Sequence, residues 1–314
     1  MKTIRLGESS LQCTRLAYGC WRLAGTGEPA HVTPEREAHG RAAVIAAFEA
    51  GYTLFDHADI YCDGMAETIF GQALREVPDM RDRILIASKC GIRKAGEPDA
   101  LAPYRYDFSA EHIIRSCEQS LRRLGVETID LYQLHRPDVL ADPAEVASAF
   151  SRLQQSGKVR EFGVSNFRPT QLAMLQRACP LRLLVNQVEI SLCHLGPFQD
   201  GTLDQCLAEK ITPLAWSPLA GGLLASSVGV NMQDPHHARK AKVHDTLDAL
   251  ARDRGTSRTN IALAWLLRHP SGIVPIVGTT NPEHIQEAVA ATNIDLTREE
   301  WYRLCEAALG QRLL

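Results

Sequence analysis

The 314-residue sequence predicts a (β/α)8 barrel, or TIM barrel, with an N-terminal β-hairpin and accessory C-terminal helices. Three observations predict it: eight short apolar runs, helix-period segments between them, and no linker or low-complexity stretch that divides the chain. Nearly continuous apolar strands that alternate with amphipathic helices indicate a parallel sheet covered by helices. Eight such units fit a closed barrel better than an open sheet, which usually stops at about five to seven strands. We therefore expect residues 1–314 to form one domain.

The opening segment IRLGESSLQCTRLAYG predicts the hairpin, because two short strands flank a Gly/Ser turn and the second leads into Gly19. The barrel strands are expected at Arg15–Gly19, Thr53–Phe55, Ile84–Ala87, Ile129–Gln133, Arg160–Gly163, Leu183–Asn186, Thr212–Ala215 and Ile273–Ile276. The helical segments are expected at Glu35–Ala50, Ala66–Arg75, Ser109–Leu124, Pro143–Ser156, Pro169–Ala178, Leu203–Glu209, Lys242–Arg254 and Asn260–Leu267. A terminal helix, Arg298–Leu309, is expected to pack outside the barrel.

Three long loops follow expected strand ends, at Trp21–Pro34, Gly91–Asp107 and Ser217–Arg239. Barrel enzymes build their sites from the loops on this face. Only Gly310–Leu314 follows the last expected helix. We expect this tail to be too short to fold over the barrel mouth, which predicts an open pocket and broad specificity.

Composition narrows the class of function. The formal charge of −3, without a long Lys/Arg run, gives no reason to expect nucleic acid or an anionic membrane. No apolar stretch approaches the ~20 residues that cross a bilayer, and MKTIRLGESS lacks the apolar core of a signal peptide. Nine cysteines form no zinc-like spacing and favour reduced thiols in a cytoplasmic protein. We expect no metal site, since Asp56, His57 and Asp59 would alternate between strand faces.

Polar residues end three successive apolar strands. Asp56 and Tyr61 lie in TLFDHADIY, Lys89 ends ILIASK, and His135 ends IDLYQLH. In a barrel these positions share one rim. Each residue alone has a plain explanation, as a cap, a solvated lysine or a structural histidine. Together, on consecutive strands, they indicate a site that donates protons.

The chemistry of such a site begins with the phenol. A free phenol has a pKa near ~10 and is a poor acid at neutral pH. We expect Lys89 to lower the pKa of Tyr61, and Asp56 to hold the lysine in its charged form. His135 is placed to hydrogen-bond a carbonyl oxygen beside the phenol. A cluster of this kind delivers a proton to a carbonyl oxygen while the carbonyl carbon receives a hydride.

The wording of these segments resembles the aldo-keto reductases. TLFDHADIYCDGMAETIFG is similar to the family segment with the catalytic Asp and Tyr, ASK carries its lysine, and DLYQLHRPD its histidine. The resemblance implies Asp56, Tyr61, Lys89 and His135 as the catalytic residues. It extends from about Leu6 to Leu309 in the family's order. The IDLYQLHRPD and GTTNPEHIQ wording most resembles a bacterial branch of general aldehyde/ketone reductases.

The resemblance also implies NADP(H), bound extended across the barrel mouth without a Rossmann domain. Ser165, Asn166 and Gln187 would hold the nicotinamide carboxamide, and Trp216 would stack on the ring. Backbone groups around Ser217–Leu219 and Gly278–Thr280 would hold the phosphates. The implied cofactor contacts are Gly19, Cys20, Trp21, Asp56, Ser165, Asn166, Gln187, Trp216, Ser217, Pro218, Leu219, Gly278, Thr279, Thr280, His284 and Glu287.

One departure concerns the 2′-phosphate of the cofactor. Members that prefer NADP usually carry a Lys or Arg around Gly278–Asn281 and an Arg where His284 stands. His284 is the only potential cation here, and an imidazole is mostly uncharged near pH 7. Glu287 takes the place of a residue that contacts the adenine amino group. We expect NADP(H) to be favoured, with NAD(H) as an open alternative.

These observations predict an NAD(P)H-dependent oxidoreductase that reduces a small-molecule aldehyde or ketone, with Tyr61 as general acid. Trp21, His57 and His135 are expected to line the substrate pocket. Two alternatives stay open. One is a cofactor-binding regulatory subunit with the same barrel that senses redox state. The other is a barrel isomerase or aldolase that uses Lys89 as a Schiff-base amine.

Overall fold

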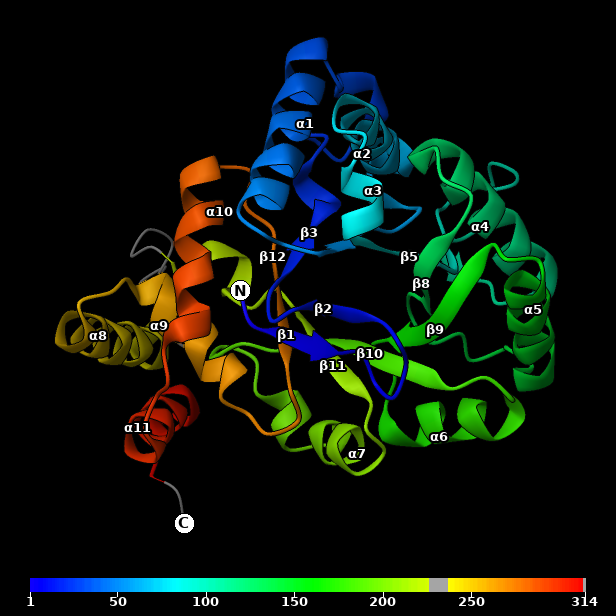
Figure 1. The fold of residues 1–314 in the computed structure, drawn as a ribbon. Coiled ribbons are helices and arrows are strands. Elements are labelled where there is room, and N and C mark those ends of the chain that lie inside the picture. The colour runs from blue at the N-terminus through cyan, green and yellow to red at the C-terminus, as the bar shows by residue number, and fades with distance from the viewer. Residues whose placement is uncertain (226–236, 313–314) are drawn as a thin grey trace.

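The computed structural model of the chain describes residues 1–225 and 237–312. Within them, eight strands close into a parallel barrel in chain order, and helices cover its outside (Figure 1). The barrel strands are β3 (Ala17–Gly19), β4 (Leu54–Asp56), β5 (Leu85–Cys90), β8 (Ile129–Leu134), β9 (Val159–Ser165), β10 (Leu183–Glu189), β11 (Thr212–Trp216) and β12 (Val274–Val277). The predicted fold class is confirmed.

The covering helices begin at side-chain caps where the sequence supplies them, such as Ser109, Asp142 and Thr297. The helices are α1 (Pro34–Glu49), α2 (Met65–Glu76), α3 (Met80–Arg83), α4 (Ala110–Leu124), α5 (Pro143–Gln155), α6 (Pro169–Ala178), α7 (Thr202–Ala208), α8 (His237–Arg254), α9 (Arg258–Leu267), α10 (Pro282–Ala288) and α11 (Arg298–Leu309). Helix α11 packs against α8 outside the barrel, as expected (Figure 1). Across residues 1–225 and 237–312, no helix combines the length and apolar character needed to span a bilayer.

The predicted hairpin closes one end of the barrel. Strand β1 (Thr3–Arg5) pairs antiparallel with β2 (Gln12–Thr14), and the pair crosses the end at which the barrel strands begin (Figure 1). Leu6 and Leu11 are buried at the hairpin and belong to the apolar cluster inside the barrel. The barrel interior is therefore a packed core that the hairpin closes at this end. A site for small molecules is expected at the opposite mouth.

The loops at that mouth contain more structure than the sequence indicates. The segment expected to be a loop at Gly91–Asp107 contains a two-stranded antiparallel ribbon of β6 (Ile92–Arg93) and β7 (Arg105–Tyr106). Strands this short carry no readable periodicity. Short 3-10 turns occupy the other connections: η1 (Cys20–Arg22), η2 (Pro29–His31), η3 (Tyr61–Gly64), η4 (Gly196–Phe198), η5 (Ala220–Gly222) and η6 (Val289–Asn293).

The third expected loop, Ser217–Arg239, is described only in part, because residues 226–236 lie outside the described ranges. Helix α8 begins at His237, before the expected start at Lys242. The described parts of this loop are residues 217–225, which contain the turn η5, and residues 237–239 at the start of α8.

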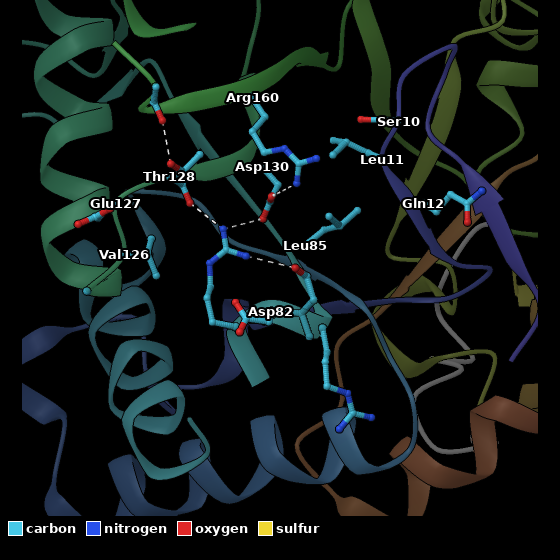
Figure 2. Close-up of a pocket in the computed structure, with 15 residues that line it drawn as sticks. Ser10, Leu11, Gln12, Asp82, Leu85, Val126, Glu127, Thr128, Asp130 and Arg160 are labelled. Carbon is cyan, nitrogen blue, oxygen red and sulfur yellow. Dashed lines mark hydrogen bonds and ion pairs between the residues drawn. The ribbon is translucent and has the colours of Figure 1, made fainter. Parts of the chain in front are cut away.

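A polar cleft of about 890 Å³ opens at the N-terminal ends of β5 and β8, away from the mouth. Figure 2 shows Asp130 at its centre, bonded to two arginines. The Asp130 carboxylate is buried, accepts from Ile86 N and Arg160 Nη1, each at 2.8 Å, and forms an ion pair with Arg81 Nη2 at 3.1 Å. Arg81 also donates to the Thr128 carbonyl at 2.9 Å. These polar groups bind one another and so hold the N-terminal ends of the strands together.

Gly40 marks the tightest crossing of α1 over the chain before it. A Cβ at this position would overlap the Leu23 carbonyl oxygen and approach Ile69 Cγ2 at 3.0 Å. Inside a helix alanine is normally favoured over glycine by ~1 kcal/mol, yet here the helix would have to move. We expect Gly40→Ala to lower the free energy of unfolding by about 1–3 kcal/mol in urea denaturation.

The exposed neighbour Ala42 supplies the matched control in the same helix. Ala42→Gly is expected to cost only the helix propensity of ~1 kcal/mol. A Gly40→Ala variant more stable than the wild type would contradict the packing described above.

Candidate active site

The centre of the mouth is a buried ion pair between neighbouring strands. Lys89 near the end of β5 is completely buried, and Asp56 at the end of β4 is 3% exposed. Lys89 Nζ donates to Asp56 Oδ1 at 2.7 Å and to the His57 carbonyl oxygen at 2.6 Å. Gln187 Nε2 of β10 donates to the same Asp56 oxygen at 2.7 Å, from across the barrel. Two buried charges are tolerated because each has a close partner.

Tyr61 and His135 complete the predicted group of four. The Tyr61 ring centroid lies 5.1 Å from Lys89 Nζ. The rings of Tyr61 and His135 meet edge to face, with centroids 6.0 Å apart. The structure thus brings together the four side chains that the sequence placed on one rim. Their roles in catalysis stay a prediction.

Protonation at this site is governed by burial. The pKa of Tyr61 is raised well above its ordinary value by burial and then by Asp56, while Arg136 lowers it. The net lowering expected for this pKa is therefore wrong, because burial and Asp56, which lies 2.7 Å from the ammonium, outweigh the attraction of Lys89. Burial and the charge of Lys89 lower the pKa of His135 well below its usual range. Near pH 7 the phenol is protonated and the imidazole is neutral.

An unusual turn directly follows Tyr61. Tyr61 lies beyond β4, at the start of η3, and not at the strand end where the sequence placed it. The next residues, Cys62 (φ 47°), Asp63 (φ 51°) and Gly64 (φ 87°), are all left-handed. A left-handed backbone costs an L-residue about 1–2 kcal/mol, so tertiary contacts must hold this turn. One is the ion pair between Asp63 and Lys94, which follows the ribbon strand β6.

The residues expected to hold a nicotinamide carboxamide form one hydrogen-bonded group. Trp216 Nε1 donates to Asn166 Oδ1 at 3.0 Å. Asn166 Nδ2 donates to Ser165 Oγ at 2.7 Å and to the His135 carbonyl oxygen at 3.2 Å, and Ser165 Oγ donates to the Gln187 carbonyl oxygen at 2.8 Å. Asn166 is left-handed at φ 62°, a conformation that asparagine tolerates better than most residues. The group therefore faces the mouth beside His135.

The segment after β11 has the form of an anion-binding turn. Ser217 (φ 49°), Ala220 (φ 50°), Gly221 (φ 70°) and Gly222 (φ 104°) have positive φ angles. Turns of this type can direct backbone N–H groups toward an anion, and here those of Ala220, Gly222 and Leu223 already donate to carbonyl oxygens within the turn. A Cβ built on Gly221 or Gly222 meets nothing within 4 Å, so the turn borders open space. These features fit a phosphate of a dinucleotide.

The second expected phosphate segment lies beside the first barrel strand. A Cβ on Gly278 would meet Gly19 O at 3.9 Å, and the Tyr18 hydroxyl donates to Thr279 O at 3.0 Å. Strands β12 and β3 thereby bring the expected contacts around Gly19 and Gly278 together. Among the remaining predicted contacts, Thr280 and Glu287 are partly exposed, His284 is exposed, and Pro218 is buried.

Two neighbours after β3 differ in what they offer. The Cys20 side chain is completely buried, so only its backbone is available to a cofactor. Trp21 is 61% exposed and free to contact a substrate or a cofactor. Arg136, which the sequence analysis did not select, lies with its guanidinium 5.5 Å from the Trp216 ring centroid. Its position directly after His135 in HRPD was the available signal.

The expected pocket role of His57 is wrong. Its side chain is completely buried, and its ring centroid lies 4.4 Å from that of Phe70 in α2. Successive residues of a strand face opposite sides, so Asp56 faces the mouth while His57 lies beneath α2. Both ring nitrogens lack a hydrogen-bond partner. The functional part of His57 is its carbonyl oxygen, which accepts from Lys89.

No set of three or more His, Cys, Asp or Glu side chains in the described ranges is placed to hold a metal ion. The exposed large apolar side chains on loops that follow strand ends are Trp21, Leu101, Tyr104, Tyr106, Val139 and Leu140. They give the mouth an apolar rim around a polar, buried centre, which is the usual composition of a small-molecule site.

Burial lowers the pKa of His57 to about 3 from 6.5. Between these pH values the unfolded chain binds a proton that the folded chain does not, so stability falls as the pH falls. We expect His57→Leu to remove this loss. Relative to the variant, the wild type should lose up to about 1.4 kcal/mol of unfolding free energy per pH unit below pH 6.5, in urea denaturation. His39→Leu, at an exposed histidine, is the control, and identical pH profiles for His57→Leu and wild type would contradict the assignment.

Comparisons with known proteins identify the family of this chain. The model of the aldo/keto reductase family matches residues 15–308. The chain is 42% identical to a 6-dehydroglucose reductase of Novosphingobium aromaticivorans, over 98% of this chain and 96% of that protein. It is 39% identical to a 6-dehydroglucose reductase of Agrobacterium fabrum, over 100% of both. The solved glycerol dehydrogenase of Gluconobacter oxydans matches with a TM-score of 0.86 at 28% identity, over 98% of this chain and 95% of that one. The chain belongs to the aldo/keto reductase family of oxidoreductases.

Proposed function

We propose that residues 1–314 act as one domain that reduces an aldehyde or ketone to an alcohol with NAD(P)H. The observation that carries this proposal is the meeting of the Tyr61 phenol, the Lys89–Asp56 pair and the His135 imidazole in the barrel mouth. Members of the family use nicotinamide cofactors, and when bound such a cofactor supplies a hydride to the carbonyl carbon.

Tyr61 acts as the general acid in this proposal. Its raised pKa keeps the phenol protonated near pH 7, so the proton is present when the carbonyl oxygen gains negative charge. The neutral imidazole of His135 hydrogen-bonds the same oxygen and orients the carbonyl. Lys89 stabilises the phenolate that is left, and Asp56 holds the ammonium in place.

The remaining groups orient the cofactor and the substrate. Ser165, Asn166 and Gln187 hold the carboxamide, and Trp216 packs against the nicotinamide ring. The turn at Ser217–Leu219 and the segment Gly278–Thr280 hold the phosphates. The family favours NADP(H) in this role, with His284 as the nearest candidate cation for a 2′-phosphate and NAD(H) use as the alternative.

The substrate class is proposed from the relatives. Both 6-dehydroglucose reductases match this chain over nearly their full lengths, which makes a sugar aldehyde the first candidate substrate. The exposed rings of Trp21 and Tyr104 provide apolar contact area with polar edges at the rim. The pocket remains open to other small carbonyl compounds, and the reverse oxidation of alcohols uses the same groups.

Replacing the proposed acid tests the assignment. We expect Tyr61→Phe to lower kcat/KM for 6-dehydroglucose and simple aldehydes by about 100-fold or more, because proton donation is lost. The measurement is NADPH and NADH oxidation at substrate concentrations on both sides of KM. Tyr302→Phe, at an exposed ring of α11, is the control and should retain wild-type rates. Full turnover by Tyr61→Phe would refute the acid assignment, and tight cofactor binding without any turnover by wild type would favour the redox-sensing subunit.

The cofactor assignment has its own test at His284. We expect His284→Arg to lower KM for NADPH by about tenfold, equivalent to ~1.4 kcal/mol, because a permanent cation then faces the 2′-phosphate. KM for NADH should change far less. Gln155→Arg adds the same charge at an exposed position of α5 and controls for non-specific attraction. Equal effects of His284→Arg on both cofactors would rule out the 2′-phosphate contact.

A further inference from the structure

We propose that Glu67 is a positioning residue that fixes the distance between the Tyr61 phenol and the Lys89 ammonium. The inference rests on the proposed function, because it gives Glu67 a part in proton delivery by Tyr61. Glu67 does not touch the reacting atoms; it acts through the turn and the strand that carry them.

Glu67 is a completely buried carboxylate in the first turn of α2. Its Oε1 accepts from the Ser88 hydroxyl at 2.6 Å, and Ser88 directly precedes Lys89 in β5. Its Oε2 accepts from Arg123 Nε of α4 at 2.7 Å and forms an ion pair with Arg123 Nη2, also at 2.7 Å. One carboxylate therefore joins the helix after Tyr61 to the strand of Lys89 and to a neighbouring helix.

The left-handed turn of Tyr61 rests on the same arginine. A Cβ on Gly64 would overlap Arg123 Nε and approach Arg123 Cδ at 2.5 Å, so the turn packs on this side chain without space to spare. Gly71 of α2 also lies against α4, since its Cβ would approach the carbonyl oxygens of Arg123 and Leu124 at 2.7 Å. Arg123, held by Glu67, thus forms the surface on which the turn lies.

Burial of the Glu67 carboxylate costs free energy, and that cost is justified only if the network fixes the positions of the elements that it joins. A buried carboxylate must offset its desolvation by strong hydrogen bonds, and an apolar side chain would fill the space without that demand. Cys62 and Asp63 are held in a conformation that relaxes when its contacts are lost. A polar network in which every member is bonded specifies one arrangement of its elements. The network joins the helix that follows the proton donor to the strand that carries the lysine, and a shift of about 1 Å between reacting groups costs on the order of 100-fold in rate.

The chain contains a matched control at the other end of the barrel. Asp130 is also a buried carboxylate bonded to two arginines and to β5, through Ile86 N. It joins strand starts and contacts no part of the mouth described above. Loss of either carboxylate should lower stability, but only the loss of Glu67 should alter proton transfer.

The experiment compares Glu67→Gln, Glu67→Ala and Ser88→Ala with Asp130→Asn in the full chain. Each variant is assayed for kcat, for KM of cofactor and substrate, for the ratio of kcat in H2O and D2O, and for unfolding in urea. We expect Glu67→Ala to lower kcat by about 10- to 100-fold, with cofactor KM within about twofold and a larger solvent isotope effect. Glu67→Gln, which keeps an acceptor for Ser88, should lose less, and Ser88→Ala tests the link if the Glu67 variants do not fold.

Asp130→Asn should lower the urea midpoint while kcat and the solvent isotope effect keep their wild-type values. Glu67 or Ser88 variants that behave as Asp130→Asn does would overturn the inference and leave the proposed function intact, provided that Tyr61→Phe is inactive. Full turnover by Tyr61→Phe would overturn the proposed function and this inference with it.

Discussion

The pairing of a lysine with an aspartate inside the barrel mouth is the constraint on which the site depends. Lys89 Nζ and Asp56 Oδ1 lie 2.7 Å apart with almost no access to water. Neither charge would be stable there alone, so strands β4 and β5 must remain adjacent and in register. Gln187 adds a donor from β10, which extends the requirement across the barrel. The closed sheet thus keeps the partners close enough to offset the desolvation cost of the buried charge pair.

That pairing also influences the protonation state of Tyr61. Because Asp56 compensates the ammonium, the Tyr61 phenol experiences burial more strongly than attraction, and it keeps its proton. The phenol itself is carried outside the sheet, on left-handed backbone that depends on α4 and on the ribbon. The site therefore combines strand register, which fixes the charges, with a turn, which fixes the donor.

The sequence predicted the barrel well because its signals are local. Pro169 opens α6 and Thr297 caps α11, and both helices have the expected bounds. Asp56 and His135 were found because strand ends share a rim. The orientation of His57 also follows from a local rule, since alternation along β4 places it opposite Asp56 and away from the pocket.

The features that the sequence could not predict depend on contacts between residues far apart in the chain. The pKa of Tyr61 depends on burial by residues from several elements, and the Glu67 network joins side chains from α2, β5 and α4. The closure of the barrel by Leu6 and Leu11, at the end where the strands begin, has a further consequence. With that end filled, water exchanges with the lysine and phenol from the mouth. In the proposed reduction, a product held in the mouth would shut these groups off from solvent, so Tyr61 would regain its proton only after the product has left.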